Sequence, residues 1–256
     1  MVNQLAVTAI IPVHNHENWV QDAILSVANQ NYENLKFVIV DDASTDNSFS
    51  KILELVDGLK DHAESTHQDN EPAEIKSGLI KGRHAAIARF RKNQGPAITR
   101  NYAANTAKDV TDVYAFLDSD DIYLPGKIEK SIKYFYNPFV GVVYSDYETV
   151  NVHTGLIARQ FKESYRRDVL LHHCIVNCDS LVSKQAFYEA GGFNEQVRVT
   201  EDYSLWLEIS KKHIICHIPE CLLRIKIGSH SSTAKISEED WKKDMMKTRL
   251  KYQNAH

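Results

Sequence analysis

Two groups of carboxylates in this chain have the residue types and positions that could bind a metal ion or a cationic ligand. Asp41 and Asp42 follow the apolar run 35–40, and Asp118-Ser119-Asp120-Asp121 follows the apolar run 114–117. Because the carboxyl ends of parallel strands share one edge of a sheet, both groups are expected at the same rim. A divalent cation would relieve their mutual repulsion, and oxygen ligands favour Mg²⁺ or Mn²⁺ over zinc. Either group alone could also simply turn the chain and cap the next helix.

The segments that must position these acids alternate between two hydrophobic patterns. Short apolar runs predict buried strands, and stretches with apolar residues at helical spacing lie between them, which favours a parallel sheet covered by helices on both faces. The predicted strands are 6–13, 35–40, 85–90, 114–117 and 141–145. Further predicted elements are a hairpin at 148–161, helices at 184–190, around Leu205 and at 238–251, and a surface loop at 61–77. The predicted class is α/β, with a mostly parallel, Rossmann-like central sheet, a small antiparallel element and a C-terminal helix.

Composition excludes several classes of protein. The 256 residues carry 34 acidic and 30 basic side chains, a net charge of −4, which argues against a nucleic-acid partner. No apolar run approaches the ~20 residues that span a bilayer, and the N-terminus lacks the features of a secretory signal, so the expected location is cytoplasmic. The four cysteines do not have the spacing of common zinc modules and are expected to be reduced thiols: Cys174, Cys178, Cys216 and Cys221.

Two common phosphate-binding loops are missing from the sequence. It contains neither Gly-x-x-x-x-Gly-Lys-Ser/Thr nor a Gly-x-Gly-x-x-Gly after the first predicted strand, which disfavours a P-loop kinase and a dinucleotide dehydrogenase. A bound nucleotide diphosphate would therefore be neutralised by a metal ion and by side chains such as Arg100. That arrangement suits a reaction in which a diphosphate is the leaving group.

Six short motifs occur in a fixed order along the chain. They are VTAIIPVHN at 7–15, VDDASTD at 40–46, TRN at 99–101, FLDSDD at 116–121, GGF at 191–193 and TED at 200–202. In this order and spacing they resemble the family 2 glycosyltransferases with the GT-A fold. The resemblance implies a single GT-A domain at 1–230, with a nucleotide-binding half at 1–117 and a metal and acceptor half at 118–230. Residues 231–256 would form a C-terminal loop and helix appendage.

The resemblance also implies residues for binding the donor. A nucleobase and donor pocket would be formed by Pro12, His14, Asn15, Asp41 and Asp42, with His14 replacing the usual aromatic residue. Arg100, Asp118 and Ser119 would lie near the ribose, the phosphates or the donor sugar. Asp118 and Asp120 match the Asp-x-Asp motif. Asp120 is the first choice of metal ligand for Mn²⁺ or Mg²⁺, and Asp118 would contact either the ribose or, through water, the metal. His230 is an additional candidate ligand.

The C-terminal motifs would supply the catalytic and acceptor residues. Asp202 matches the catalytic base of an inverting displacement, in which it takes the proton from an acceptor hydroxyl. Gly192, Phe193, Glu201 and Trp206 would lie on the acceptor side. A helix N-terminus is the competing interpretation of Glu201-Asp202, and the two roles are compatible. Arg224 and His230 would belong to a loop that closes over the donor.

The implied activity is transfer of a sugar from a nucleotide diphosphate sugar, most commonly a UDP-sugar, to a hydroxyl of a glycan or lipid-linked acceptor. Cell-surface polysaccharide synthesis, with peripheral contact at the inner membrane face, would be its setting. A catalytically inactive relative that binds nucleotide sugars and a sugar nucleotidyltransferase are the alternatives. The nucleotidyltransferase is disfavoured because 12–18 contains no Gly, Lys or Arg. Donor sugar, acceptor, linkage and oligomeric state are left open.

Overall fold

The computed structural model describes residues 4–62, 71–197, 199–228 and 237–253. Within these ranges eleven strands form one sheet, and four neighbouring strands at its centre run parallel. In sheet order they are β5 (Arg83–Phe90), β2 (Leu35–Asp41), β1 (Val7–Val13) and β6 (Val113–Phe116). Val7 pairs with Leu35 on one side and with Val113 on the other. The carboxyl ends of these strands therefore share one edge.

Antiparallel pairs extend the parallel centre on both sides. Beyond β5 lie β4 (Pro72–Ile80) and β3 (Asp57–His62). Beyond β6 follow β10 (Leu181–Ser183), β8 (Val140–Asn151), β11 (Ile214–Ile227) and β7 (Ile122–Tyr123), and β9 (Ile157–Gln160) pairs with β8. The pair β8–β11 is again parallel. The predicted α/β class is confirmed, with a larger antiparallel part than expected.

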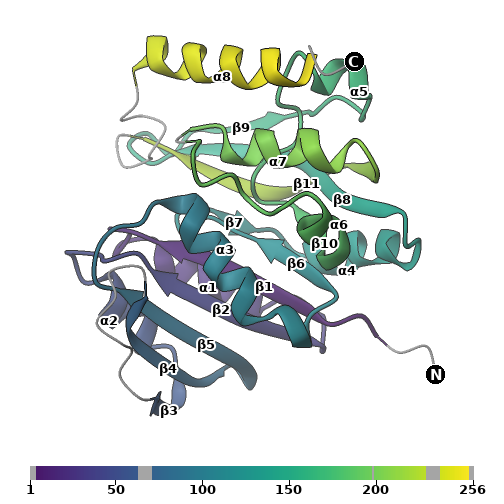
Figure 1. Ribbon diagram of the computed structural model, residues 1–256. Helices are drawn as coiled ribbons and strands as arrows, with labels where there is room; N and C mark the ends of the chain where they lie inside the picture. The colour runs from purple at the N-terminus through teal and green to yellow at the C-terminus, as the bar shows by residue number, and fades with distance from the viewer. Residues whose placement is uncertain (1–3, 63–70, 198, 229–236, 254–256) are drawn as a thin grey trace.

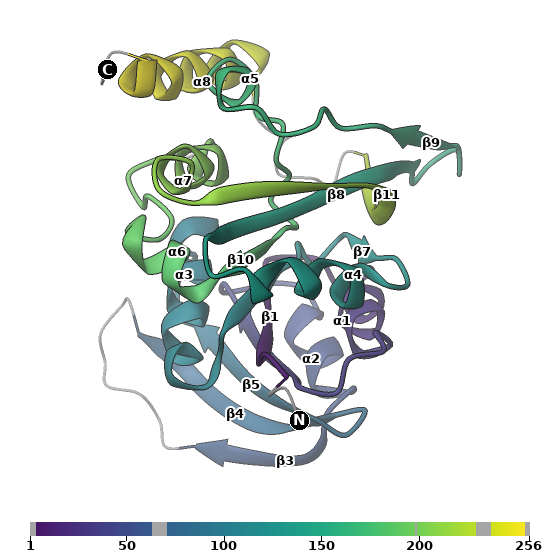
Figure 2. The same ribbon diagram turned by 90° about the vertical axis from the view of Figure 1, so that its right-hand side faces the viewer.

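Helices cover both faces of the sheet (Figures 1 and 2). The helices are α1 (Val20–Ala28), α2 (Ser48–Leu53), α3 (Pro96–Thr106), α4 (Lys127–Ile132), α5 (Arg167–Leu170), α6 (Lys184–Glu189), α7 (Glu201–Ile209) and α8 (Glu238–Gln253), with short 3-10 turns at Lys108–Val110 and Lys133–Tyr136. Alternate residues of β1 point to opposite faces of the sheet. Ala9 and Ile11 pack in the core with α1 and α2, whereas Ile10 packs with α3, α6 and α7. This explains why the whole strand is apolar.

Two segments differ from the sequence-based expectation. The stretch 61–77 is not simply a loop, because its two ends belong to the paired strands β3 and β4. Every residue of β3 is exposed, so its sequence lacks the apolar alternation that would predict a strand. Residues 63–70 lie outside the described ranges. The segment 214–227 forms the long strand β11, which was not predicted because a bulge between Ile218 and Cys221 interrupts its pattern. Arg224 therefore lies in a strand and not in a closing loop.

The C-terminal helix α8 packs against α7. Thr200 and Thr248 share a hydrogen bond between their hydroxyls (2.7 Å), and the hydroxyls of Ser204 and Tyr252 are 3.1 Å apart. Within the described ranges, no helix combines the length and the apolar character needed to cross a bilayer.

Candidate active site

Three loops meet at the carboxyl edge of the parallel strands. They follow β1, β2 and β6, and side-chain hydrogen bonds join them. His14 Nδ1 donates to the carbonyl of Asp42 (2.7 Å), and His16 Nδ1 is 2.7 Å from Ser119 Oγ. The expectation that the two acid groups, 41–42 and 118–121, lie at one rim is therefore confirmed.

The loop after β1 is held by a residue with left-handed backbone conformation. Asn15 has φ of 56°, a region that asparagine tolerates better than most residues. Its backbone N–H donates to Ser44 Oγ (3.0 Å), and its Oδ1 accepts from the backbone N–H of Thr45 (2.8 Å). Asn15 Nδ2 also lies 3.2 Å from His14 Nε2. Since Nδ1 of His14 donates to a carbonyl, Nε2 is the accepting nitrogen, and the ring is held at the rim with a defined tautomer.

Asp41 and Asp42 are buried and engaged with the backbone. The Asp42 carboxylate accepts from the N–H groups of Gln94 (2.7 Å) and Gly95 (2.9 Å), which ties β2 to the turn before α3. Asp41 Oδ1 accepts from the N–H of Ser44 (2.9 Å). Burial raises the pKa of both carboxyls, although these hydrogen bonds oppose the shift. The role of the pair in binding a nucleobase stays a prediction.

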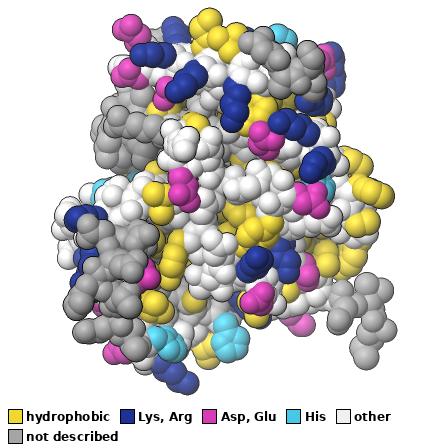
Figure 3. Space-filling view, in the orientation of Figure 1, with side chains coloured by type: hydrophobic (Ala, Val, Ile, Leu, Met, Phe, Trp, Pro, Cys, Tyr) yellow, Lys and Arg dark blue, Asp and Glu magenta, His cyan; other side chains and the backbone are white. Residues whose placement is uncertain are grey.

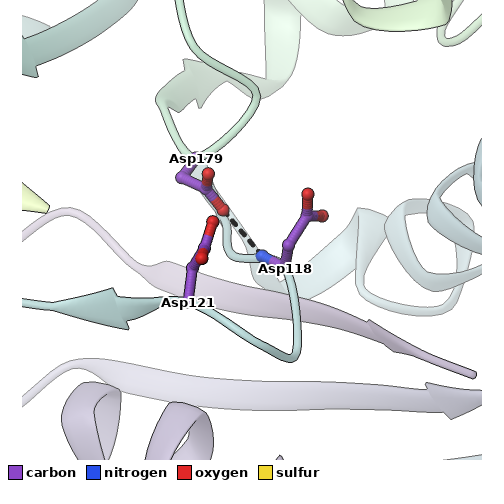
Figure 4. Close-up of side chains that lie close together, drawn as sticks. All are labelled: Asp118, Asp121 and Asp179. Atoms are coloured by element: carbon purple, nitrogen blue, oxygen red, sulfur yellow. Dashed lines mark hydrogen bonds between the residues drawn. The ribbon is translucent and has the colours of Figure 1, made fainter. Parts of the chain in front are cut away.

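Asp118, Asp121 and Asp179 form a cluster of carboxylates beside this rim (Figure 4). One oxygen atom from each lies within 4.8 Å of the others. The backbone N–H of Asp118 donates to Asp179 Oδ1 (2.7 Å), and Asp121 Oδ1 accepts from the N–H of Lys226 (2.9 Å). Asp121 and Asp179 are buried, whereas Asp118 is partly exposed.

The electrostatics of this acid cluster fit a divalent cation. Burial, followed by repulsion from Asp118, raises the pKa of Asp179 to about 8. Burial and repulsion from Asp179 raise the pKa of Asp121 well above its usual range. A bound cation would replace this repulsion with attraction, and three hard oxygen donors suit Mg²⁺ or Mn²⁺.

The composition of the acid cluster differs from the sequence-based expectation. Asp120, the first choice of ligand, lies outside the cluster and faces His16, with 3.9 Å between its Oδ1 and Nδ1 of the histidine. Asp179 was missed, because it precedes β10 with no motif around it and reaches the rim only through the fold. The structure thus favours Asp118, Asp121 and Asp179 as ligands, and the role of Asp120 stays a prediction. The tentative ligand His230 lies outside the described residues.

Arg100 joins the acid cluster to the helix that carries the predicted base. It is buried in α3, and its guanidinium donates to Asp118 Oδ1 (2.5 Å) and to Glu201 Oε1 (3.0 Å). The same guanidinium lies 5.4 Å from the centre of the Phe193 ring. The side chain of Glu201, predicted on the acceptor side, is thus used in the structure to hold Arg100.

Asp202 lies in the first turn of α7, beside Arg100 and the acid cluster. Thr200 is the N-cap residue, so Glu201 and Asp202 are the two acids of the first turn, where the helix dipole favours negative charge. Burial, followed by repulsion from Glu201, nevertheless raises the pKa of Asp202 to about 7. A carboxylate with this pKa can accept a proton efficiently near neutral pH.

The 191–193 turn is locked to α3 by Asn101. Asn101 Oδ1 accepts from the N–H of Phe193, and its Nδ2 donates to the carbonyl of Phe193, both at 2.9 Å. Gly192 has φ of 73°, and a Cβ there would lie 2.8 Å from Asn101 Oδ1, so a glycine is required. Asn101 belongs to the TRN motif, but the motif alone does not predict this role.

Two predicted acceptor-side residues are core residues in the structure. Phe193 is buried and packs edge-on against Phe116, with 5.1 Å between ring centres. Trp206 is fully buried in the core beneath α7. Neither side chain reaches the surface, so in this structure both support the site from within the core. The placement of Gly192, Phe193 and Trp206 on the acceptor side stays a prediction.

We expect the metal-free protein to lose stability as the pH rises from about 5 to about 8. Asp179, with a pKa of about 8, keeps its proton in the folded state over this range, whereas an unfolded aspartate loses it near pH 3.8, so folding is favoured at lower pH. Mn²⁺ binds the deprotonated carboxylates and should raise Tm more at pH 8 than at pH 5, by at least ~3 °C, the shift that about 1 kcal/mol produces in a domain of this size.

Thermal unfolding with EDTA or MnCl₂ at both pH values measures this effect. Asp179→Asn should remove most of the metal response, whereas Asp168→Asn, which changes an exposed aspartate, should leave it intact. An equal or larger response to Mn²⁺ at pH 5 would contradict the assignment of the acid cluster.

Comparison with known proteins identifies the family of this chain. The sequence model of Glycosyl transferase family 2 matches residues 8–190. This chain belongs to glycosyl transferase family 2. The match includes all residues of the acid cluster and ends before α7, so it does not include Asp202.

Family 2 relatives resemble this chain over most of its length. An uncharacterized glycosyltransferase of Rickettsia conorii is 28% identical over 241 residues, which cover 91% of this chain and 35% of the relative. WfgD of Escherichia coli, described as a UDP-Glc:alpha-D-GlcNAc-diphosphoundecaprenol beta-1,3-glucosyltransferase, is 30% identical over 214 residues, which cover 83% of this chain and 72% of WfgD. The chain thus spans about a third of the length of the Rickettsia relative.

Two solved structures share the fold of this chain. TarS 1–349 of S. aureus in complex with UDP-GlcNAc has a TM-score of 0.69 and 17% identity, over 95% of this chain and 65% of TarS. The mannosyltransferase PcManGT of Pyrobaculum calidifontis, in complex with GDP-Man and Mn²⁺, has a TM-score of 0.63 and 17% identity, over 91% of this chain and 60% of PcManGT. The GT-A fold that the motifs predict for this family 2 member is therefore confirmed.

Proposed function

We propose that this chain transfers a sugar, with inversion, from a UDP-sugar to a hydroxyl of a lipid-linked acceptor in the synthesis of a cell-surface polysaccharide. One observation carries the proposal: Arg100 connects Asp118 of the acid cluster to Glu201, the residue next to Asp202. A group that can bind the diphosphate end of a donor and a carboxylate that can accept a proton are thereby held together at one rim. An inverting displacement needs both, because the leaving group and the attacking hydroxyl act on the same carbon.

Asp202 is the proposed catalytic base. With a pKa of about 7, a large fraction of this carboxylate is ionised at neutral pH. As the acceptor oxygen bonds to the anomeric carbon, Asp202 takes the hydroxyl proton and the bond to the diphosphate breaks. The surrounding burial disfavours the charged carboxylate, which increases its tendency to take up the proton.

Asp118, Asp121 and Asp179 are the proposed metal ligands. A Mg²⁺ or Mn²⁺ ion bound there would supply positive charge that stabilises the departing diphosphate. The buried Arg100 holds Asp118 in place through an ion pair. The Mn²⁺ complex of the structurally similar PcManGT supports the choice of a divalent cation.

The donor pocket is proposed at the loops after β1 and β2. Pro12, His14, Asn15, Asp41 and Asp42 would surround the nucleobase, and Ser119 would approach the ribose. UDP is preferred because WfgD is described as using UDP-Glc and TarS binds UDP-GlcNAc. The description of WfgD also supports an acceptor linked to a lipid through a diphosphate, which would place this chain at the inner face of a membrane.

Calorimetric titration with UDP, GDP and dTDP tests the donor site. We expect UDP to bind in the presence of Mn²⁺ or Mg²⁺ and to bind at least about tenfold more weakly with EDTA or after Asp118→Asn, because the metal and its ligands carry much of the affinity for the diphosphate. Asp57→Asn, an exposed change in β3, is the matched control. Failure of all three nucleotides and of UDP-sugars to bind would contradict the proposal, and binding without turnover would favour the inactive relative.

A further inference from the structure

A cavity of about 590 Å³ lies between α8 and the 172–174 segment that follows α5. In Figure 3 basic and hydrophobic side chains, with acidic ones among them, lie at the end of the molecule where Figure 1 places α8. The volume of this cavity falls in the range of small-molecule sites, which is roughly 300–1,000 Å³. We call it the α8 groove; the donor site described above does not include it.

One part of the α8 groove is apolar and accessible. Trp241, Met246 and Leu250 line it while being 39%, 60% and 44% exposed. Trp241 and Met245 are one helical turn apart, as are Met246 and Leu250, so two i, i+4 pairs form an apolar strip along α8. Large apolar side chains gathered around a hollow indicate a binding surface for hydrocarbon.

The other part of the α8 groove is cationic. Lys242 and Arg249 line it together with His172 and His173, and none of the described lining residues is acidic although α8 itself contains four acids. Arg249 is partly buried, and its Nε has no hydrogen-bond acceptor among the described residues. An anionic ligand in the groove would pair with the positive charges of Arg249 and Lys242.

The α8 groove borders the turn that carries the proposed base. Cys174 lines the groove and lies close enough to Asp202 that this carboxylate, after burial, raises the pKa of the thiol. Thr248, next to Arg249 in sequence, forms a hydrogen bond with Thr200, the N-cap residue of α7. The groove and the first turn of α7 are therefore neighbours in the structure.

We propose that the α8 groove binds the phosphate and the adjoining hydrocarbon of a lipid-linked acceptor, so that the acceptor sugar extends toward Asp202. A lipid phosphate joins an anion to an apolar chain, and the groove presents cations beside an apolar strip. A hollow that borders the base suits a single acceptor molecule better than the flat surface of a bilayer. This inference rests on the proposed function for the direction in which the sugar points, but the binding itself can be tested alone.

Farnesyl diphosphate, titrated in EDTA while tryptophan fluorescence is followed, tests the groove directly. We expect saturable binding, a signal that disappears in Trp241→Phe, and an affinity at least about tenfold lower after Arg249→Gln, since charge-assisted hydrogen bonds contribute on this order. Lys243→Gln removes a charge from α8 outside the groove and should change nothing. Farnesol and inorganic diphosphate should each bind more weakly, because farnesol lacks the anion and diphosphate lacks the hydrocarbon chain.

The outcomes separate this inference from the proposed function. If UDP binds with Mn²⁺ but farnesyl diphosphate does not bind, the proposed lipid site in the groove is wrong and the donor site is still supported. If farnesyl diphosphate binds but UDP and UDP-sugars do not, the lipid site is supported and the proposed transferase activity is contradicted. The lipid site would also be contradicted if Arg249→Gln and Lys243→Gln lowered the affinity for farnesyl diphosphate equally. The same holds if vesicles of anionic phospholipid bound as tightly as farnesyl diphosphate. With an active enzyme, Arg249→Gln should raise KM for a lipid-diphosphate acceptor about tenfold and leave KM for the UDP-sugar unchanged.

Discussion

Asp202→Asn is expected to lower kcat by about 10²- to 10⁴-fold while the affinity for UDP changes little, because positioned general bases contribute on this order and the side chain does not belong to the acid cluster. The amide is nearly isosteric with the carboxylate but cannot take a proton from the acceptor. Steady-state transfer to the acceptor and calorimetric binding of UDP with Mn²⁺ measure the two quantities on the same preparation.

The pH profile gives an independent readout of the same residue. Because burial and the neighbouring Glu201 raise the pKa of Asp202 to about 7, kcat/KM should fall about tenfold per pH unit below that value, as the base becomes protonated. Glu208→Gln, on the same helix with its carboxylate paired to Lys211 near the surface, is the matched control and should keep both the rate and the profile. If Asp202→Asn retained more than a tenth of the activity, another residue would have to be the base.

Arg100→Met should destabilise the fold by about 3–5 kcal/mol, the usual cost of removing one partner of a buried ion pair. The methionine roughly fills the space but leaves Glu201 and Asp118 without their hydrogen-bond donor. Urea unfolding, analysed with matched slopes, measures the change. We also expect transfer to be lost, since Asp118 and the turn that carries Asp202 would no longer be tied together.

Two controls distinguish the buried network from a general effect of losing an arginine. Arg166→Met removes an exposed partner of Asp168 and should leave the free energy of unfolding nearly unchanged, because water and salt screen this pair. Adding Glu201→Gln to Arg100→Met should recover part of the stability, because one uncompensated buried charge is then neutral. If Arg100→Met and Arg166→Met lowered the free energy of unfolding equally, the ion pairs of Arg100 with Asp118 and Glu201 would not contribute more to stability than an exposed pair.

Local sequence patterns were sufficient for the central elements. The runs that became β1, β2, β5 and β6 are apolar because both faces of each strand are covered, and such a pattern is visible without a structure. The acid groups at 41–42 and 118–121 follow strands of this parallel core directly. Their convergence at one edge could therefore be predicted, since parallel strands end on the same side.

The exposed and interrupted strands could not be predicted in the same way. β3 is held by backbone hydrogen bonds to β4 and buries no side chain, so its sequence resembles a loop. The alternation of apolar and polar residues in β11 is interrupted at its bulge, and its partner β8 lies about 75 residues away in the chain. In both cases pairing with a neighbouring strand, and not local preference, decides the structure.

The sequence by itself determined the order of the strands and helices in the parallel core, the family and the rim at which the acids meet, because hydrophobic periods and short motifs are local properties. Only the tertiary structure decided which side chains share a site. It brought Asp179 to Asp118 and Asp121, paired Arg100 with Glu201, and buried Phe193 and Trp206 in the core. These outcomes depend on how elements far apart in the chain pack together, and burial, charge pairing and metal-binding geometry exist only once that packing has formed.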